Sequence, residues 1–480
     1  MIMPVEIIGP ALACVHVLIV LIASSHVALY KRDSRAAIAW TGLIWLAPFV
    51  GTLLYILLGI NRIERRARTL WADHPITTKA SGTPAGDVTL DPETAGSTRL
   101  VQLSHLVRNV TELDLTFEND VEPFAGGNEA YPAMLEAIRE ARHTIGLSTY
   151  IFDADETGLA FATALQAAVK RGVKVCVLVD AIGAKLSHSS IIPHLEQLGV
   201  PVRTFNPPLV RWRFRYANLR NHRKILTVDG TTAFTGGLNI RGSCVSSPSR
   251  DVQVNDLHFR LRGPVVKHVQ DTFVSDWVFA SDEQLSGDGW YPMQHPAGNC
   301  AARGVVDGPD EQLDRLRLTL LGACHCAEKS LRIITPYFLP DAPLISALNV
   351  AALRGVSVEI LIPQKSNERL VEWACNAQLW QLVNRGCQIR RTQPPFDHSK
   401  LMLVDDEWAL LGSANWDPRS LRLNFEFNVE CYNKDLTRKL HGIFESKKST
   451  SSLVTIEELQ SRSFPIKLRD GVARLASPFL

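Results

Sequence analysis

The stretch Asn221-His-Arg-Lys-Ile-Leu-Thr-Val-Asp229 returns later in the chain as Asp397-His-Ser-Lys-Leu-Met-Leu-Val-Asp405. Both copies read HxKxxxxD, and six residues further on each continues as GGxN or GSxN. A single match of this length can be accidental, but two copies in register indicate a duplication within the chain. The pair predicts one active site that contains two histidines.

The elements around the two motifs are duplicated as well. Apolar patterns and stop signals predict the order helix, strand, helix, strand in each half. The predicted elements are residues 128–142, 144–152, 159–171 and 173–180, and then 311–327, 331–337, 343–354 and 356–363. The fold class is therefore α/β, with tandem repeats that each form a sheet flanked by helices and share one active site. Residues 225–228 and 401–404 are candidates for antiparallel pairing.

Composition restricts the class of protein. The 480 residues, 46% hydrophobic and 21% charged, suffice for two or three domains with substantial cores. A net charge of +2 gives no global basic field that would favour nucleic acid as the partner. The nine cysteines have no disulfide-like spacing, which favours a reducing compartment. Cys324-His-Cys326 resembles half of a metal site, but no second cluster accompanies it, so we expect ordinary helix residues and no metal.

The first 60 residues predict a transmembrane hairpin. Residues 7–30 and 36–60 are apolar stretches, each long enough to cross the hydrocarbon layer as a helix. A secretory signal peptide is the alternative, but the first six residues contain no Lys or Arg and a second apolar stretch follows at once. Three basic residues lie between the stretches and four follow them closely, which predicts that the large carboxy-terminal part is cytoplasmic.

The remaining chain divides by composition. Residues 61–75 are rich in Arg, and residues 77–98 are rich in Thr, Ser, Gly, Pro and Ala, as in a juxtamembrane linker. We predict a hairpin at 1–60, a linker at 61–110, a first repeat at 111–295, a second repeat at 296–445 and a carboxy-terminal tail at 446–480.

The HxK spacing predicts the chemistry. On a strand, residues two apart point to the same face, so His222 and Lys224 project together, as do His398 and Lys400. Two imidazoles and two positive charges suit displacement at a phosphodiester, which needs a nucleophile or base, an acid for the leaving alkoxide and cations on the nonbridging oxygens. Lysine suffices as a point charge, so neither a metal nor another cofactor is required.

Other polar residues accompany each histidine. Asn239 and Asn415, from the GGxN and GSxN motifs, are candidates to donate hydrogen bonds to the phosphate oxygens. Asp256 and Glu426 lie downstream of their respective copies and are candidates to orient a histidine through its second ring nitrogen.

Asp229 and Asp405 complete the two HxKxxxxD motifs and stay among the candidate catalytic residues. Their position where each strand turns favours a structural turn role over direct catalysis. His188, His258 and His295 have no comparable neighbours in the sequence, and we expect them to be structural or surface residues.

These motifs resemble those of the phospholipase D superfamily, and the amino-terminal hairpin narrows the resemblance to bacterial cardiolipin synthases. The supporting segments are Trp40 and residues 51–59, Phe234-Thr-Gly-Gly-Leu-Asn-Ile240, Gly263-Pro-Val-Val266, Tyr337-Phe-Leu-Pro-Asp341, the segment from Leu423 and the final Ala-Ser-Pro-Phe-Leu. The resemblance covers nearly the whole chain.

The resemblance implies transphosphatidylation. Histidine attacks one phosphatidylglycerol, glycerol leaves, and a second phosphatidylglycerol attacks the phosphatidyl-histidine to give cardiolipin. By analogy with the superfamily, His222 would be the nucleophile, and His398 would protonate the leaving glycerol and later deprotonate the incoming alcohol. The implied setting is the bacterial inner membrane, with a multi-pass anchor and with the bilayer and phosphatidylglycerol as partners. Neither the motifs nor the resemblance indicates an oligomeric state.

The chain departs from the commonest family pattern in three places. Ser399 stands where alanine is frequent, Trp416 follows Asn415, and residues 241–254 lack aromatic side chains. These departures leave the acceptor open between phosphatidylglycerol, another phospholipid and a small alcohol.

Just before the first motif, residues 209–220 alternate arginine with aromatic side chains. Such a segment fits a lipid interface, with arginines on anionic headgroups, and it fits a half-buried strand equally well.

Three classes of function follow from these features. A membrane phosphatidyltransferase is favoured by the hairpin, with a phospholipase D-type hydrolase as the variant in which water resolves the intermediate. A nuclease of the same superfamily would use the same catalytic residues, but the near-neutral charge and the anchor argue against it. A non-catalytic scaffold would be expected to have lost a histidine or lysine of the motifs, and this chain has kept all four.

Overall fold

The structure of the chain is a computed structural model. It describes residues 5–31, 34–59, 90, 96–187, 189–206, 219–247, 252–309 and 314–477. Most of the predicted linker, His188 and the arginine–aromatic segment up to residue 218 lie outside the described residues. The chain splits into two compact units, a small one with the N-terminal helices and a large one with both repeats.

The small unit contains α1 (Val5–Tyr30), α2 (Ser34–Leu46), α3 (Pro48–Leu54) and the π-helix η1 (Tyr55–Gly59). The second apolar stretch was expected as one helix and is instead broken before Pro48, because proline lacks the N–H that would continue the helix but suits a first helical position. Among the described residues, no helix combines the length and hydropathy that a membrane crossing requires. The transmembrane hairpin stays a prediction.

The large unit is built on one 16-stranded sheet, with strand order β18-β13-β12-β11-β15-β16-β17-β10-β1-β9-β7-β6-β2-β3-β4 and with β5 paired to β17. The first half contains β1 (Thr116–Ala125), β2 (Thr144–Thr149), β3 (Lys174–Asp180), β4 (Val202–Phe205), β5 (Arg220–Asn221), β6 (Ile225–Val228), β7 (Thr232–Gly236), β8 (Val254–Asn255) and β9 (Leu257–Arg262). The second half contains β10 (Cys300–Asp307), β11 (Ser330–Ile334), β12 (Ser357–Pro363), β13 (Gln388–Thr392), β14 (Phe396–Asp397), β15 (Leu401–Val404), β16 (Trp408–Gly412), β17 (Asn424–Tyr432) and β18 (Ser452–Leu453).

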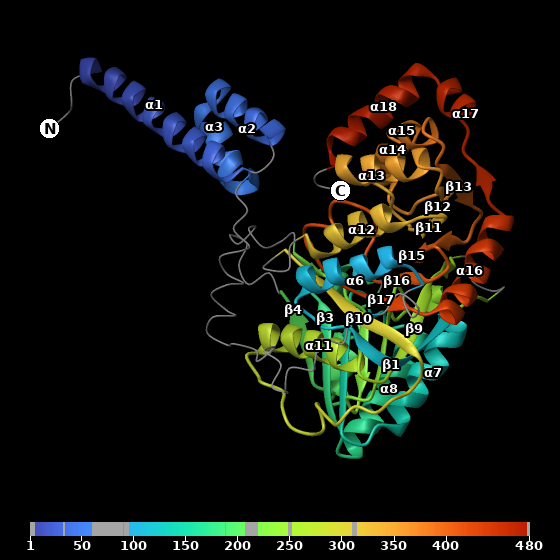
Figure 1. The fold of residues 1–480 in the computed structure, drawn as a ribbon. Helices are drawn as coiled ribbons and strands as arrows, with labels where there is room; N and C mark the ends of the chain where they lie inside the picture. The colour runs from blue at the N-terminus through green and yellow to red at the C-terminus, as the bar shows by residue number, and fades with distance from the viewer. Residues whose placement is uncertain are drawn as a thin grey trace. The chain divides into compact units, whose positions relative to one another are not determined.

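The two repeats occupy equivalent positions on the two sides of the centre of this sheet. β1 and β10 pair antiparallel at its centre (Figure 1). The order of equivalent strands outward from them is the same in both repeats. The expectation of a separate sheet in each repeat was wrong, because pairing β1 with β10 satisfies the backbone groups of two strands that would otherwise be open edges. The antiparallel pairing expected for residues 225–228 and 401–404 is confirmed by β2·β6 and β11·β15.

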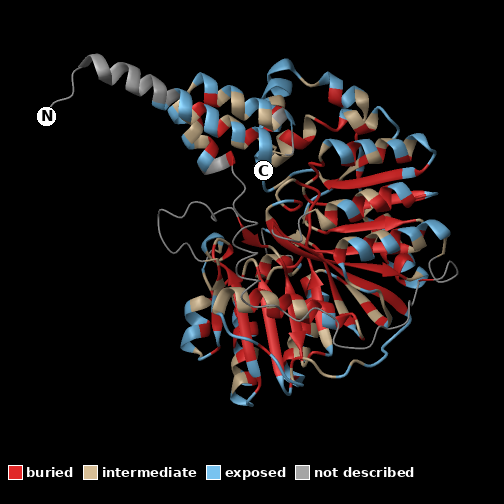
Figure 2. Ribbon diagram, turned by 60° about the vertical axis from the view of Figure 1, so that its left-hand side comes forward, coloured by how far each residue is buried: buried red, intermediate tan, exposed pale blue. Residues whose placement is uncertain are grey.

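Helices cover both faces of the sheet (Figure 2). Among the described residues of the large unit, the helices of four or more residues are α6 (Thr98–Thr111), α7 (Gly127–Glu140), α8 (Glu156–Lys170), α9 (Gly183–Leu186), α10 (Ile192–Gln197), α11 (Val266–Ser281), α12 (Arg315–Cys326), α13 (Ala342–Leu353), α14 (Arg369–Asn376), α15 (Trp380–Val383), α16 (Lys434–Ser449), α17 (Ile456–Ser461) and α18 (Phe464–Leu475), and η3 (Gly242–Cys244) is a 3-10 turn.

Successive side chains of β2 point to opposite faces of the sheet, and helices pack on each face. Ile145 and Leu147 belong to the core that β2 shares with α7 and α8. Gly146 points the other way, where an added Cβ would lie 2.5 Å from the Phe273 ring of α11. A strand buried on both faces often reads as a continuous apolar run, as β3 does from Val175 to Val179. β2 instead alternates Ile145 and Leu147 with the small residues Gly146 and Ser148.

Two predicted boundaries differ from the structure. α6 lies inside the predicted linker and contributes Leu100, Leu103 and Val107 to the core of the second repeat. The tail predicted from residue 446 begins inside α16, and its β18 joins the sheet beside β13. These segments belong to the folded unit because their apolar side chains complete its core.

Candidate active site

Two short strands bring the motifs of both repeats together. β5, just before His222, pairs in parallel with β17 of the second repeat, with Asn221 opposite Phe425. β14, just before His398, pairs in parallel with β8 of the first repeat, with Asp397 opposite Asn255. Each HxK triplet lies in an irregular segment after its short strand, not on a strand as expected. The two imidazole ring centroids are 6.5 Å apart, so both histidines share one site.

Because each short strand pairs with the other repeat, each histidine contacts a carboxylate of the other repeat. His222 Nδ1 lies 3.0 Å from Oε1 and 3.1 Å from Oε2 of Glu426, in the second repeat. His398 Nδ1 lies 2.7 Å from Oδ2 of Asp256, in the first repeat. Both residues that were candidates to orient a histidine lie within hydrogen-bonding distance of an imidazole, but each contacts the histidine of the other copy. With Nδ1 held in this way, Nε2 is the ring nitrogen that can reach a substrate phosphorus.

Ser413 of GSxN and Gly237 of GGxN occupy equivalent positions, and each lies next to a carboxylate. Ser413 Oγ donates to Glu426 Oε2 at 2.5 Å. At the equivalent Gly237, an added Cβ would lie 2.0 Å from Asp256 Oδ1, so a serine does not fit there. GGxN and GSxN therefore differ because each adapts to its own carboxylate.

Burial controls the charge of the two histidines. The side chains of His222 and His398 are 11% and 12% exposed. Burial lowers the pKa of His222, and the nearby Glu426 carboxylate offsets this only in part. Burial, together with the ammonium of Lys400, lowers the pKa of His398 to about 4. Both imidazoles are therefore neutral at neutral pH in the substrate-free site, as a nucleophile must be.

The two carboxylates keep their charge. Burial alone would raise the pKa of Glu426, but contact with His222 and Lys224 brings it below its ordinary value. Burial acts on Asp256 in the same way, and Lys400 and His398 lower its pKa below the ordinary value. Each carboxylate can therefore stabilise a positive charge that develops on its histidine.

Lys224 and Lys400 each lie beside the histidine of their own motif. Lys224 Nζ donates to the His222 carbonyl oxygen at 2.6 Å and lies 5.7 Å from the centroid of the Tyr150 ring. Lys400 Nζ lies 2.9 Å from Nδ1 of His398. Burial lowers the pKa of Lys224 to about 7 and that of Lys400 to about 8. An anionic phosphodiester would restore the ordinary preference for the charged form.

Asp229 and Asp405 hold backbone. Asp229 accepts three hydrogen bonds from the N–H groups of residues 142–144, at 2.7 to 2.9 Å. Asp405 accepts three from residues 328–330, at 2.7 to 2.8 Å. Both aspartates have positive φ, 50° and 54°, at the turn after their strands. This geometry fits the turn role that the sequence favoured, and it fixes the start of β2 and β11.

The two asparagines contact protein in the substrate-free site. Asn239 Oδ1 accepts from the Ile151 N–H at 3.1 Å. The side chain of Asn415 hydrogen-bonds Asp417, while its buried Oδ1 has no partner among the described residues. Donation to phosphate oxygens stays a prediction for both side chains.

Next to each motif, a charged residue of the motif segment forms an ion pair with a residue of a helix. The signs of the two charges are reversed between the repeats. In the first, Arg223 Nη1 lies 2.5 Å from Oδ1 of Asp276 on α11, and Asn221 Nδ2 donates to Oδ2 of the same carboxylate at 2.9 Å. In the second, Lys447 Nζ on α16 donates at 2.6 Å to Oδ2 of Asp397, the residue before His398.

Ser399 completes the second arrangement, because its Oγ donates to Asp397 Oδ1 at 2.6 Å. The departure from alanine at this position therefore has a structural reason. Trp416, another departure, is 4% exposed and packs on Phe338 in the core of the second repeat.

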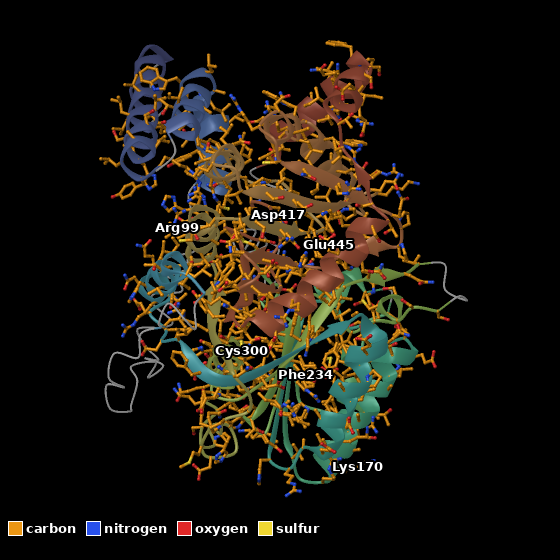
Figure 3. All side chains as sticks on the ribbon, turned by 45° about the vertical axis from the view of Figure 1, so that its right-hand side comes forward. Arg99, Lys170, Phe234, Cys300, Asp417 and Glu445 are labelled. Atoms are coloured by element: carbon orange, nitrogen blue, oxygen red, sulfur yellow. The ribbon has the colours of Figure 1, made fainter. Side chains whose placement is uncertain are left out.

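Three site residues were not predicted. The ring of Tyr150 lies 5.4 Å from that of His222, and the ring of Tyr337 lies 6.1 Å from that of His398. Asp417, labelled in Figure 3 within the second half, is buried, and burial raises its pKa to about 6. The duplication could not reveal these residues. Arg241 occupies the position of Asp417 in the first copy, and Tyr150 and Tyr337 differ by one position when the two repeats are aligned.

The remaining candidates lie outside this group. His258 is buried beneath Gly236, and burial lowers its pKa to about 4. His295 belongs to an exposed loop. Cys324 and Cys326 pack in the hydrophobic core on α12. Within the described part of the chain, no group of three or more His, Cys, Asp and Glu side chains is arranged to hold a metal ion.

The fold and the site define a class of protein. A pseudo-symmetric sheet that brings two HxK triplets to one site fits the phospholipase D-like class, and the family model described as cardiolipin synthase, PLD-like domain, matches residues 134–277 and 320–448. A second model, for the phospholipase D-nuclease N-terminal region, matches residues 17–59. The chain belongs to the cardiolipin synthase family of phospholipase D-like enzymes.

Individual relatives match over nearly their whole length. The chain is 31% identical over 464 residues to the major cardiolipin synthase ClsA of Bacillus subtilis (strain 168), covering 94% of this chain and 95% of the relative. It is 31% identical over 473 residues to the cardiolipin synthase of Listeria monocytogenes serotype 4b (strain F2365), covering 97% and 98%. Phosphatidylserine synthase of Haemophilus influenzae Rd KW20 superposes with a TM-score of 0.61 at 15% identity, over 79% of this chain and 100% of that one, which shows the fold alone.

Proposed function

We propose that this enzyme joins two phosphatidylglycerol molecules into cardiolipin and releases glycerol. The observation that carries the proposal is the site itself. Two neutral imidazoles lie with ring centroids 6.5 Å apart, each held through Nδ1 by a buried carboxylate, with a lysine beside each. The relatives named as cardiolipin synthases support the choice of product.

His222 is the proposed nucleophile. Its Nε2 attacks the phosphorus of the first phosphatidylglycerol, and the bond from phosphorus to the headgroup glycerol breaks. Glu426 stabilises the positive charge that forms on the ring. Lys224 and Lys400 offset negative charge on the nonbridging oxygens.

His398 is the proposed acid and base. The anionic phosphodiester raises its pKa on binding, so that it takes up a proton and delivers it to the leaving glycerol oxygen. The hydroxyl of the second phosphatidylglycerol then gives a proton to His398 and attacks phosphorus, which breaks the bond to His222. Cardiolipin leaves, and both imidazoles return to their starting state.

The N-terminal helices are the proposed membrane anchor. Large apolar side chains are exposed along them, among them Leu18, Ile22, Leu29, Trp45 and Leu46, and such a surface suits lipid. The match of residues 17–59 to the N-terminal model is a second support. The basic residues after the helices favour a multi-pass anchor that leaves the catalytic unit on the cytoplasmic side of the bacterial cell membrane.

The test is product analysis on the full chain in phosphatidylglycerol vesicles. Mass spectrometry should find one glycerol released per cardiolipin formed. His222→Ala and His398→Ala, as matched controls, should form neither product. Phosphatidic acid as the main product would instead make the enzyme a phospholipase, in which water resolves the intermediate.

A further inference from the structure

α18 leaves an apolar stripe open to solvent. Phe464, Leu468, Val472 and Leu475 are 75%, 55%, 59% and 75% exposed. They are spaced four, four and three residues apart, so they lie on one face of the helix. Isolated exposed apolar residues are ordinary, but a continuous stripe on one helix face marks an interaction surface.

The opposite face of α18 is anchored to the second repeat. Asp470 and Ala473 are buried there. Asp470 accepts hydrogen bonds at 2.7 Å from Arg462 and from Arg469. The guanidinium of Arg469 lies 4.4 Å from the ring centroid of Trp373 on α14. α18 therefore presents its stripe from a fixed position and does not need the stripe for its own packing.

The charges around the stripe are positive. Residues 461–477 contain four basic residues and one acidic residue, Asp470, so the segment has a net charge of 4 − 1 = +3. The acidic residue is on the buried face, whereas Lys467 and Arg474 are exposed beside the stripe. An apolar face with basic flanks is the pattern of a helix that lies in the surface of an anionic bilayer.

The stripe is connected to the active site through α14. Trp373 and the carbonyl of Asn376 contact the α18 region, through Arg469 and Arg462. Val371, Glu372 and Cys375 of the same helix line a cavity of about 410 Å³ that also contacts Tyr337. Tyr337 in turn packs against His398, with ring centroids 6.1 Å apart.

We propose that α18 lies in the headgroup region of an anionic bilayer, with Phe464, Leu468, Val472 and Leu475 between the lipids. This second attachment brings the cavity beside Tyr337 to the surface where lipid substrates are found, and it rests on the proposed function. A bilayer is chosen over a second copy of the chain because exposed positive charges flank the stripe, and identical positive surfaces repel each other.

A depth measurement tests the contact directly. The full chain with Leu468→Cys is labelled with a polarity-sensitive fluorophore in vesicles of phosphatidylglycerol and phosphatidylcholine that carry nitroxide-labelled lipid. We expect quenching of this label and none at Lys170→Cys, at the end of α8 in the first repeat (Figure 3). The unsubstituted chain measures background labelling. An unquenched Leu468→Cys label overturns the proposal, whether the stripe then meets a second copy or another segment of the chain.

Activity separates this proposal from the proposed function. Leu468→Asp with Val472→Asp should lower cardiolipin formation in vesicles at least about tenfold, and should leave turnover of dispersed short-chain phosphatidylglycerol unchanged. Leu159→Asp, at an exposed apolar site on α8, should change neither. Equal loss on both substrates, or no loss on either, contradicts the role of α18. Absence of cardiolipin from the unsubstituted chain refutes the proposed function, whereas the quenching result still decides the position of α18.

Discussion

Each histidine of the candidate site contacts a carboxylate from the other repeat. The identities of the histidines, lysines, Asp256 and Glu426 could be predicted because a duplicated motif gives every residue an internal control. The pairing could not, because His222 and Glu426 are 204 residues apart and are brought together by the parallel pairing of β5 with β17. Asp417 was missed because it has no counterpart of the same type.

Glu426→Gln should slow cardiolipin formation at least about 100-fold, because an amide cannot stabilise the charge that develops on His222. The circular dichroism spectrum and the melting temperature should change little, since Gln keeps the shape of Glu. Steady-state kinetics in vesicles measures the first effect. A rate equal to that of the unsubstituted enzyme would remove Glu426 from the site.

The lysines predict the alkaline limb of the pH profile. A lysine is charged below its pKa, and burial lowers the pKa of Lys224 to about 7 and that of Lys400 to about 8. The value of kcat/KM, which reports the free enzyme, should therefore fall as the pH rises through 7 to 8 and phosphate stabilisation is lost. Lys224→Arg should move that limb upward in whatever activity remains, because a guanidinium stays charged. A limb at the same pH in this variant would assign it to another group.

Among the elements, those predicted from the repeated apolar patterns follow these patterns, whereas the long helix α6 and the shortest strands were not predicted. The boundaries of α8, β3, α13 and β12 lie within a few residues of those predicted. β5, β8 and β14 have two residues each and carry no periodicity, yet they assemble the site. In the ion pairs next to the two motifs, the helix supplies the carboxylate in the first repeat (Asp276 on α11) and the ammonium in the second (Lys447 on α16). The HxK motif alone does not predict this difference.

Asp276→Asn should lower the free energy of unfolding by about 3–5 kcal/mol, because it removes the charged partner that lies 2.5 Å from the buried Arg223 guanidinium. Lys267→Gln, on the same helix, is the matched control. The Lys267 side chain is 55% exposed in the pair with Asp271, so its loss should cost less than about 1 kcal/mol. Urea unfolding measures both. Equal effects of the two substitutions would contradict a structural role for the buried pair.

In the large unit, the repeats act as one body. The sheet runs through both, α6 completes the core of the second repeat, and β1 pairs with strands of both halves. The sequence indicated two repeats and a shared site, but the joining of their edges depends on long-range pairing that local patterns do not encode.

A site assembled within one chain predicts that two inactive variants cannot rescue each other. His222→Ala and His398→Ala, made separately, mixed and reconstituted together, should stay inactive in the vesicle assay. In a second experiment, the mixture is unfolded and refolded, because refolding allows two chains to exchange repeats. Recovered activity before refolding would show that the site is shared between chains.

Capture of the covalent intermediate tests whether His222 is the nucleophile. The full chain is mixed with phosphatidylglycerol, quenched within one turnover, digested and examined by mass spectrometry. We expect a phosphatidyl group on the peptide that contains His222. This group should be lost when a second phosphatidylglycerol is added before quenching, with cardiolipin formed in equal amount. A phosphatidyl group on His398, or turnover with no histidine adduct at any time, would contradict this expectation.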